Sequence, residues 1–297
     1  MRKALVLGVN GYLGSNFAHM LQTSGYHVTG SDVQASGILP GIDYISCDVT
    51  SMDALKSLDW QTDAVFCFFG ATGTQAGFQY YRRFIEINEI GLLNVLESIR
   101  LAGTHPVVLF PSTRLMYAAS DGSPLEEVAA LDPKTIYAVN KIAGEHFLKV
   151  FKNRYGIPYV IFRIGVPYGN LAPGAYSFGT MAHFLTQARN GQPIRVFGDG
   201  RQRRSFTHIS DIYLQVMAVA AQQQHWNEVY NICGEELDLA TIAQAMAVRF
   251  GVPVHFEPWT EEDLLLEVGD SAFSGKRIRQ ATGVCMQYQF KDWVAAL

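Results

Sequence analysis

The sequence predicts an α/β fold with a doubly wound parallel sheet and a smaller, mixed α/β lobe in the C-terminal part of the chain. Two observations support this prediction. Strand-sized apolar runs alternate with helical stretches over residues 3–163, which is typical of a parallel sheet covered by helices. A glycine-rich turn follows the first run, where such sheets bind phosphates. The 297 residues are enough for one large domain or two modest ones.

The composition argues against several kinds of partner. The net charge of −4 and the pI near 6.1 give no electrostatic footprint for nucleic acid or an anionic membrane. The apolar runs are far shorter than a membrane span, and no cleavable apolar segment precedes the first strand. The cysteines lack metal-type spacing, and we expect free, buried thiols rather than disulfides at Cys47, Cys67, Cys233 and Cys285. We therefore expect a cytoplasmic protein with no metal, membrane or nucleic-acid partner.

The first strand, residues 3–8, leads into a turn with GxxGxxG spacing and then a helix to about residue 24. Glycines allow a tight turn and close backbone approach, and a helix N-terminus favours a pyrophosphate. The spacing differs from the usual GxGxxG, and a purely structural turn is the alternative. We predict that this turn contacts a dinucleotide through Gly8, Asn10, Gly11, Tyr12, Leu13 and Gly14.

Acidic residues follow the next two strands. Asp32 ends the strand His27–Ser31, where a carboxylate can accept both ribose hydroxyls of NAD and repel the 2′-phosphate of NADP. A solvated carboxylate is the alternative. Asp48 and Val49 follow the strand Asp43–Cys47, and we predict that they meet the adenine amine and ring.

The fourth strand, residues 63–69, opens into a loop of small residues over 70–74, where backbone can approach a ligand at Gly70 and Thr72. A long helical segment follows. Asn88 in this segment either holds a water or a backbone group near the tyrosine described next, or faces solvent.

A tyrosine and a lysine four residues apart, Tyr137 and Lys141, lie on one face of a predicted helix. An ammonium beside a phenol lowers the phenol pKa, so that this tyrosine could take a proton from a hydroxyl or give one to a carbonyl. An ordinary surface helix is the alternative. Thr113 follows the fifth strand, Pro106–Phe110, and can hydrogen-bond the same substrate oxygen.

The pattern changes after the sixth strand, Tyr159–Arg163. A Pro/Gly loop, Ala172–Tyr176, precedes a helix around Phe178–Asn190 and a Gly-Asp-Gly turn with three nearby arginines: Arg201, Arg203 and Arg204. These could clamp a phosphate by bidentate contacts or form a solvated basic loop. Val229–Ile232 is predicted to return to the sheet.

These segments predict two structural units. A Rossmann-type domain covers residues 1–165, with 206–233 returning to it. A substrate-binding lobe combines residues 166–205 and 234–297.

Together, the glycines, Asp32, Asp48-Val49, Thr113, Tyr137-x-x-x-Lys141 and the block from Gly198 to Asp211 resemble the extended short-chain dehydrogenase/reductase family, in its branch of NAD-dependent nucleotide-sugar epimerases and dehydratases. The resemblance implies an acid/base role for Tyr137, with Lys141 binding the nicotinamide ribose and lowering the tyrosine pKa. It places Thr113 at the family's Ser/Thr position and Pro167 against the nicotinamide. It also implies an arginine, here Arg204, near the substrate diphosphate.

The sequence departs from the family pattern at three places that contact the substrate or the cofactor in the family. Arg114-Leu115 stand where dehydratases carry Asp-Glu, so a 4,6-dehydratase is not expected. Val166 replaces an asparagine that contacts substrate, and Phe69 stands beside the cofactor where small residues are usual. The predicted substrate contacts are Thr72, Thr113, Arg114, Val166 and Arg204.

Three functions follow as candidates. The first is an epimerase that oxidises a nucleotide sugar to a transient keto-sugar with NAD and reduces it again. The second is a reductase of a 4-keto sugar nucleotide, and the third is a non-catalytic dinucleotide-binding regulator. The sequence does not identify the nucleotide base, the sugar or the reacting carbon of the substrate.

We expect a homodimer through helices near 80–101 and 133–153, where Ile90, Leu93 and Phe147 lie at the interface or face the sheet.

Overall fold

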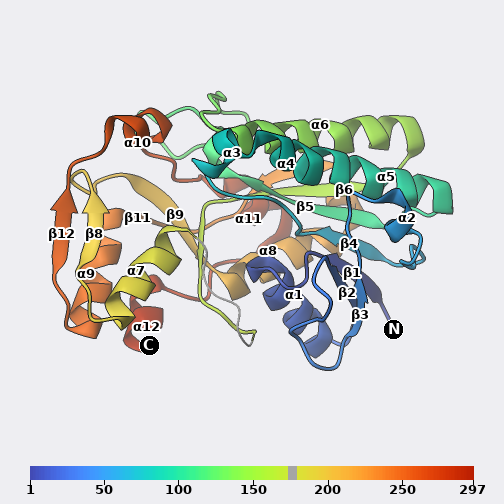
Figure 1. The fold of residues 1–297 in the computed structure, drawn as a ribbon, viewed down its shortest axis with the longest axis horizontal. Helices are drawn as coiled ribbons and strands as arrows, with labels where there is room; N and C mark the ends of the chain where they lie inside the picture. The colour runs from blue at the N-terminus through green and yellow to red at the C-terminus, as the bar shows by residue number, and fades with distance from the viewer. Residues whose placement is uncertain (173–178) are drawn as a thin grey trace.

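In the computed structural model, which describes residues 1–172 and 179–297, a seven-stranded parallel sheet forms the larger part of the molecule (Figure 1). Its strand order is β10-β6-β5-β4-β1-β2-β3, which confirms the doubly wound fold. The strands are β1 (Lys3–Leu7), β2 (His27–Asp32), β3 (Asp43–Ser46), β4 (Ala64–Cys67), β5 (Val107–Thr113), β6 (Tyr159–Ile164) and β10 (Glu228–Asn231).

Helices cover both faces of this sheet, because successive strand residues point to opposite faces and both sets are apolar. On β1, Ala4 and Val6 join one core cluster, and Leu5 and Leu7 join the other. The first face is covered by α1 (Tyr12–Thr23), α8 (Ile209–Ala220) and α11 (Lys276–Thr282).

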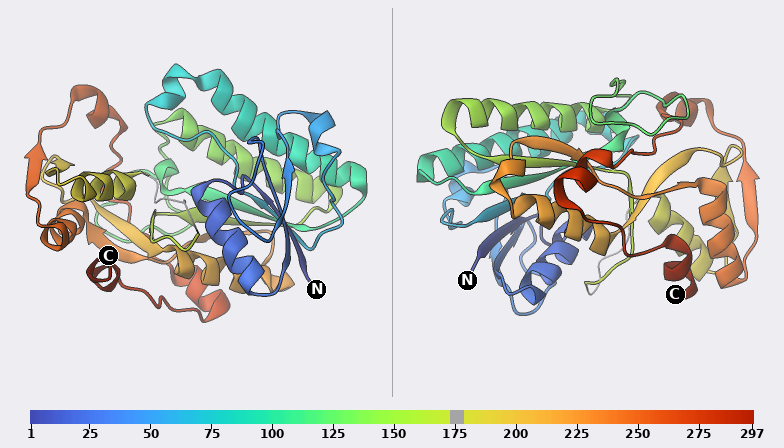
Figure 2. Two further views of the ribbon diagram at one scale, coloured as in Figure 1. Left: turned by 60° about the horizontal axis from the view of Figure 1, so that its bottom comes forward. Right: turned by 180° about the vertical axis from the view of Figure 1, so that it is seen from behind.

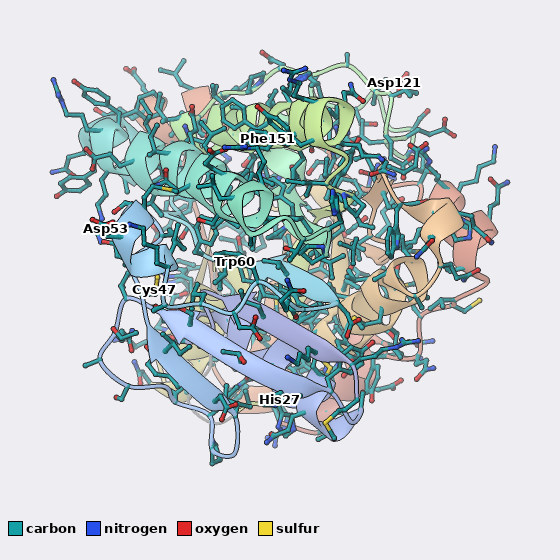
Figure 3. All side chains as sticks on the ribbon, turned by 90° about the vertical axis from the view of Figure 1, so that its right-hand side faces the viewer. His27, Cys47, Asp53, Trp60, Asp121 and Phe151 are labelled. Atoms are coloured by element: carbon teal, nitrogen blue, oxygen red, sulfur yellow. The ribbon has the colours of Figure 1, made fainter. Side chains whose placement is uncertain are left out.

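The second face is covered by α2 (Met52–Leu55), α5 (Gly91–Ala102) and α6 (Ile136–Tyr155). Figure 2 shows the sheet enclosed between these two layers. Trp60, marked in Figure 3, is buried in the second core cluster, and Phe151, also marked there, is partly buried and packs against this cluster. The short elements are α3 (Ala76–Gln79), α4 (Tyr81–Ile85), the π-helical turn η1 (Glu86–Ile90) and the 3-10 turns η2 (Arg114–Met116) and η3 (Gln223–His225).

A second group of elements lies beyond the carboxyl ends of the sheet strands, on the left in Figure 1. It contains a three-stranded sheet of β7 (Val166–Tyr168), β9 (Arg203–His208) and β11 (Glu235–Asp238) and a pair of β8 (Ile194–Phe197) and β12 (Val254–Glu257). Its helices are α7 (Thr180–Arg189), α9 (Leu239–Phe250), α10 (Glu261–Leu266) and α12 (Phe290–Ala295). The domain boundaries given above stay a prediction.

Two sequence predictions about strands gain detail. The strand predicted over Val229–Ile232 is β10, which pairs in parallel with β6. The fifth strand is longer than expected, so that Thr113 is its last residue rather than part of the loop after it. The predicted loop Ala172–Tyr176 falls outside the described residues after Ala172.

The helices predicted for dimerisation expose apolar side chains. Ile90 is exposed, while Leu93 is half-buried and Phe147 packs against the core. The homodimer stays a prediction. All four cysteines are free, and Cys47, Cys67 and Cys233 are buried as expected, but Cys285 is exposed, so the prediction is wrong for that residue. Within the described residues, every helix is too short or too polar to cross a membrane.

The turn after β1 depends on glycine. Gly8 has φ +81°, and a Cβ there would lie 2.4 Å from the backbone nitrogen of Phe69. A Cβ on Gly14 would lie 2.0 Å from the carbonyl oxygen of Gly8. Both distances are far below van der Waals contact, so the start of α1 can approach β1 and β4 this closely only without side chains.

We expect Gly8→Ala to destabilise the protein more than Gly25→Ala. Gly25 has a similar φ of +83°, but a Cβ added there would have nothing within 4 Å. The control therefore carries only the left-handed backbone cost of about 1–2 kcal/mol, whereas Gly8→Ala adds an overpacking cost of about 1–3 kcal/mol. Denaturant unfolding of both variants measures the difference, and equal losses would contradict it.

Candidate active site

A cavity of about 710 Å³ opens at the carboxyl ends of β4, β5 and β6, between the two groups of elements. Its wall on the sheet side comes from the glycine turn, the ends of β4 and β5, and α6. Its opposite wall comes from β7, Arg204 and the segment 259–268. Open α/β sheets bind ligands at this edge.

The three predicted catalytic residues all line this cavity: Thr113, Tyr137 and Lys141. Thr135 caps the start of α6, because its Oγ1 accepts a hydrogen bond from the Ala138 nitrogen at 3.1 Å. Tyr137 therefore lies in the first turn, and Lys141 lies one turn further along the same face. The Lys141 Nζ lies 5.7 Å from the centre of the Tyr137 ring and 4.5 Å from that of Phe110.

The electrostatics of this pair differ from the expectation. Burial raises the pKa of Tyr137 to about 12, and burial also lowers the pKa of Lys141 to about 8. Desolvation disfavours both charged forms, and Lys141 is not among the causes that shift the pKa of Tyr137. That Lys141 lowers the tyrosine pKa stays a prediction.

Part of the predicted cofactor site faces the cavity. The lining residues are Gly11, Tyr12, Leu13, Phe69, Gly70, Tyr137, Lys141 and Pro167. The others lie outside the lining: Gly8, Asn10, Gly14, Asp32, Asp48, Val49 and Asn88. The N-terminus of α1 carries no side-chain cap, so its backbone N–H groups point to the cavity edge without competition from its own N-cap.

Asp32 is held in place by backbone groups. Its Oδ2 accepts a hydrogen bond from the Asn10 nitrogen at 3.1 Å, and its Oδ1 accepts one from the Val33 nitrogen at 2.8 Å. A carboxylate has about four acceptor positions, so two remain for ribose hydroxyls. The Asn10 side chain itself binds the following loop through Gln34 and Ser36.

The two residues predicted to contact the adenine, Asp48 and Val49, are less well placed for a ligand than Asp32 is. Asp48 is exposed, and its Oδ1 accepts hydrogen bonds from the nitrogen and hydroxyl of Thr50. Val49 is buried in the second core cluster, and a Cβ on Gly91 would lie 2.8 Å from it. Its contact with a ligand stays a prediction.

Asn88 holds a backbone group, which decides between the two alternatives left by the sequence. It is buried within the π-helical turn η1, and π-turns recur at functional sites. Its side chain accepts a hydrogen bond from the Ala71 nitrogen at 2.8 Å and donates one to the Ala71 carbonyl at 3.0 Å. The loop after β4, which contributes Gly70 and Thr72 to the cavity, is fixed in this way.

One of the three clustered arginines reaches the cavity. Arg204 lines it, whereas Arg203 pairs with Glu236 and Asp270, and the Arg201 side chain is 87% exposed. Neighbouring residues of β9 point to opposite sides, so Arg203 and Arg204 cannot act together. The prediction of a clamp of three arginines is therefore wrong.

Arg204 is partly neutralised by Glu267, with its Nη2 at 3.0 Å from the Glu267 Oε2. Its Nε atom is buried and has no hydrogen-bond partner among the described residues. The hydroxyl of Ser112, another cavity residue, is buried and unpaired in the same sense. Buried unpaired polar atoms are costly and mark places where a ligand could supply the partner.

The segment 259–268 has no motif, and sequence reasoning did not assign it to the site. It contributes Trp259, Asp263, Leu266, Glu267 and Val268 to the cavity. A second cavity of about 340 Å³ adjoins the first, because Thr180, Arg204 and Trp259 line both. Its other walls are His183, Phe184, Arg195, Phe197 and Leu239.

The described part of the chain holds no group of three or more His, Cys, Asp or Glu residues able to bind a metal ion.

Comparisons with known proteins agree on one family. The model of the "NAD dependent epimerase/dehydratase family" matches residues 4–233. A putative UDP-glucose 4-epimerase of Methanocaldococcus jannaschii is 27% identical over 241 residues, 77% of this chain and 75% of that protein.

Two solved structures have the same fold. The UDP-glucose 4-epimerase of Thermus thermophilus in complex with NAD has a TM-score of 0.87 at 23% identity, with 99% of this chain and 96% of that chain covered. The dTDP-glucose 4,6-dehydratase DesIV of Streptomyces venezuelae, with NAD bound, also has a TM-score of 0.87 at 22% identity, covering 99% and 95%.

We expect Lys141→Met to stabilise the protein at pH 7. The lysine is charged there in both folded and unfolded chains, and its burial costs up to about 3 kcal/mol for a pKa lowered from its ordinary 10.5 to about 8. Between pH 8 and 10.5 the unfolded chain binds the proton more strongly than the folded one. The wild type therefore regains stability over this window, and the advantage of the variant shrinks.

Urea unfolding at pH 7 and pH 9.5 measures this change, with Lys149→Met on the same helix as the control. If the difference in unfolding free energy between Lys141→Met and the wild type were the same at both pH values, the lowered pKa of Lys141 would be contradicted.

Proposed function

The chain belongs to the NAD dependent epimerase/dehydratase family, and we propose that it is a nucleotide-sugar epimerase that works through a transient keto-sugar. The observation that carries this proposal is the shared cavity. Thr113, Tyr137 and Lys141 line it together with the glycine turn and Arg204. Proton transfer, cofactor and phosphate contacts would thus converge on one space.

The residues present fit NAD. The uncapped N-terminus of α1 suits the pyrophosphate, and the closeness of Gly8 to Phe69 leaves no side chain in the way. Asp32 retains acceptor positions for the adenosine ribose, which favours NAD over NADP. When bound, NAD supplies a hydride acceptor that also returns the hydride.

Tyr137 would take the proton from the sugar hydroxyl and return it later. With its pKa raised to about 12, the phenol needs a nearby positive charge to act as a base. Lys141, one helical turn away, is the cation on the same face of α6.

Thr113 would orient the same substrate oxygen. Its Oγ1 accepts a hydrogen bond from the Leu115 nitrogen at 3.2 Å. Because that acceptor position is used, the hydroxyl proton is available to donate to the substrate.

Arg204 would bind the diphosphate of the substrate. Its side chain lines both cavities and therefore lies at their junction. The smaller cavity, where the rings of Phe197 and Trp259 lie 5.4 Å apart, would then take the nucleoside.

A reductase of a 4-keto sugar nucleotide would use the same residues in one direction, so the second candidate stays open. The exclusion of a 4,6-dehydratase also stays a prediction. Arg114-Leu115 lack carboxylates, but Asp263 and Glu267 bring two into the cavity from another segment.

We further propose a cytoplasmic homodimer formed through α4, α5 and α6. The exposed apolar side chains on this face support it: Tyr81, Ile90, Val139 and Val150. Analytical ultracentrifugation of the purified protein tests this assembly, and a monomer at micromolar concentration would refute it.

We expect Tyr137→Phe to bind NAD normally and to lose turnover by about 10²–10⁴-fold, the usual contribution of a positioned acid/base. Tyr155→Phe, at the far end of the same helix, is the control and should keep full activity. Isothermal titration with NAD and a coupled epimerase assay measure the two effects. Near-normal turnover of Tyr137→Phe would refute the acid/base role of Tyr137.

We expect the purified epimerase to contain NAD and to need none added. A reductase would instead consume NADH in proportion to product. Assay of released cofactor and of NADH consumption separates the two.

The nucleotide base of the substrate can be identified from the thermal stabilisation of the protein by UDP-, dTDP-, GDP- and CDP-sugars in the presence of NAD, because a ligand that binds the native state raises its stability.

A further inference from the structure

We propose that the sugar of the substrate carries a carboxylate and that Arg114 binds it. This inference rests on the proposed function and names its substrate class. The substrate would be a nucleotide-linked uronic acid rather than a neutral hexose.

The position of Arg114 places it at the sugar end of the site. It directly follows Thr113, the residue proposed to hold the reacting oxygen, and begins the turn η2. It lines the main cavity together with Tyr137 but does not line the smaller one. Arg204 lines both cavities and therefore lies nearer the nucleoside side.

The two arginines that line the main cavity differ in their ion pairing. Glu267 pairs with Arg204 at 3.0 Å, but no carboxylate of the described residues lies within 4.0 Å of the Arg114 guanidinium. Its one hydrogen bond there goes from Nη1 to the Ser271 hydroxyl at 3.0 Å, a neutral acceptor. The sequence of residues 173–178 contains no Asp or Glu.

Arg114 is thus a desolvated cation that lines the ligand space and has no carboxylate within ion-pair distance among the described residues. Burial lowers its pKa well below the ordinary value and the nearby Arg204 lowers it further, whereas Glu267 acts in the opposite direction from beyond that distance. An arginine in such surroundings favours an anion that can accept two parallel N–H bonds, which a carboxylate does.

The chemistry of a hexuronic acid matches this geometry. If its C4 hydroxyl meets Thr113 and Tyr137, the carboxylate stands on C5, the neighbouring ring carbon. Because Arg114 lines the same cavity as Thr113 and Tyr137, its side chain can reach that substituent. A neutral hexose presents a hydroxymethyl group there and leaves the guanidinium uncompensated.

Titration calorimetry with NAD present and three ligands tests the inference: UDP, UDP-glucose and UDP-glucuronate. We expect the wild type to bind UDP-glucuronate most tightly. Arg114→Gln should weaken UDP-glucuronate on the order of 10- to 100-fold, the usual loss for a charged hydrogen-bonded partner, and leave UDP unchanged. Arg114→Lys should keep part of the preference, because the charge remains.

Two further variants serve as references. Arg204→Gln should weaken all three ligands, since they share the diphosphate. Arg201→Gln, on an exposed side chain, should weaken none. Unchanged NAD affinity and melting temperature establish that the Arg114 variants are folded.

Three results would overturn the inference. Equal wild-type affinity for UDP-glucose and UDP-glucuronate would remove the carboxylate preference while leaving the proposed function intact. Loss of UDP affinity in Arg114→Gln would assign this residue to the diphosphate. A protein that binds none of the three ligands would overturn the inference for uridine-linked sugars, whereas the proposed function would fail only if the dTDP-, GDP- and CDP-sugars also did not bind.

Discussion

The parallel pairing of β5 between β4 and β6 is the constraint on which the site depends. Because all three strands run the same way, their carboxyl ends meet at one edge of the sheet. Thr113 at the end of β5, the loop after β4 and the start of β7 are therefore neighbours although they are far apart in sequence. A helix that crosses this edge, as α6 does at Tyr137, completes the arrangement without any additional element.

The parallel sheet could be predicted from local sequence patterns, whereas the order of its strands could not. Apolar runs of strand length, glycine at the first turn and a hydroxyl at the end of the fifth strand are signals that depend on neighbouring residues alone. The opposite directions of Arg203 and Arg204 needed a strand that the sequence had not indicated. The pKa of Tyr137 depends on how deeply the site is desolvated, which is a property of the assembled fold.

The segment 259–268 could not have been predicted as part of the site. Its place in the cavity depends on long-range contacts, such as the hydrogen bond from Gln75 to Asp263 and that from the Lys134 ammonium to the Glu267 carbonyl. These contacts join two regions that share no sequence signal. The same segment sets the charge balance of the cavity, because Glu267 forms an ion pair with Arg204 and only a longer-range attraction with Arg114.

The late position of β10 has a consequence for synthesis. This strand, Glu228–Asn231, forms the edge of the central sheet next to β6, and its residue Asn231 accepts a hydrogen bond from the Tyr117 hydroxyl. A nascent chain that has emerged only through β6 therefore has an unpaired sheet edge, which is prone to wrong association. The carboxylate of Asp211 accepts hydrogen bonds from the backbone nitrogens of Gln287 and Tyr288, which lie 76 and 77 residues further along the chain. The first turn of α8 is therefore held in place only after a segment that is synthesised much later docks onto it.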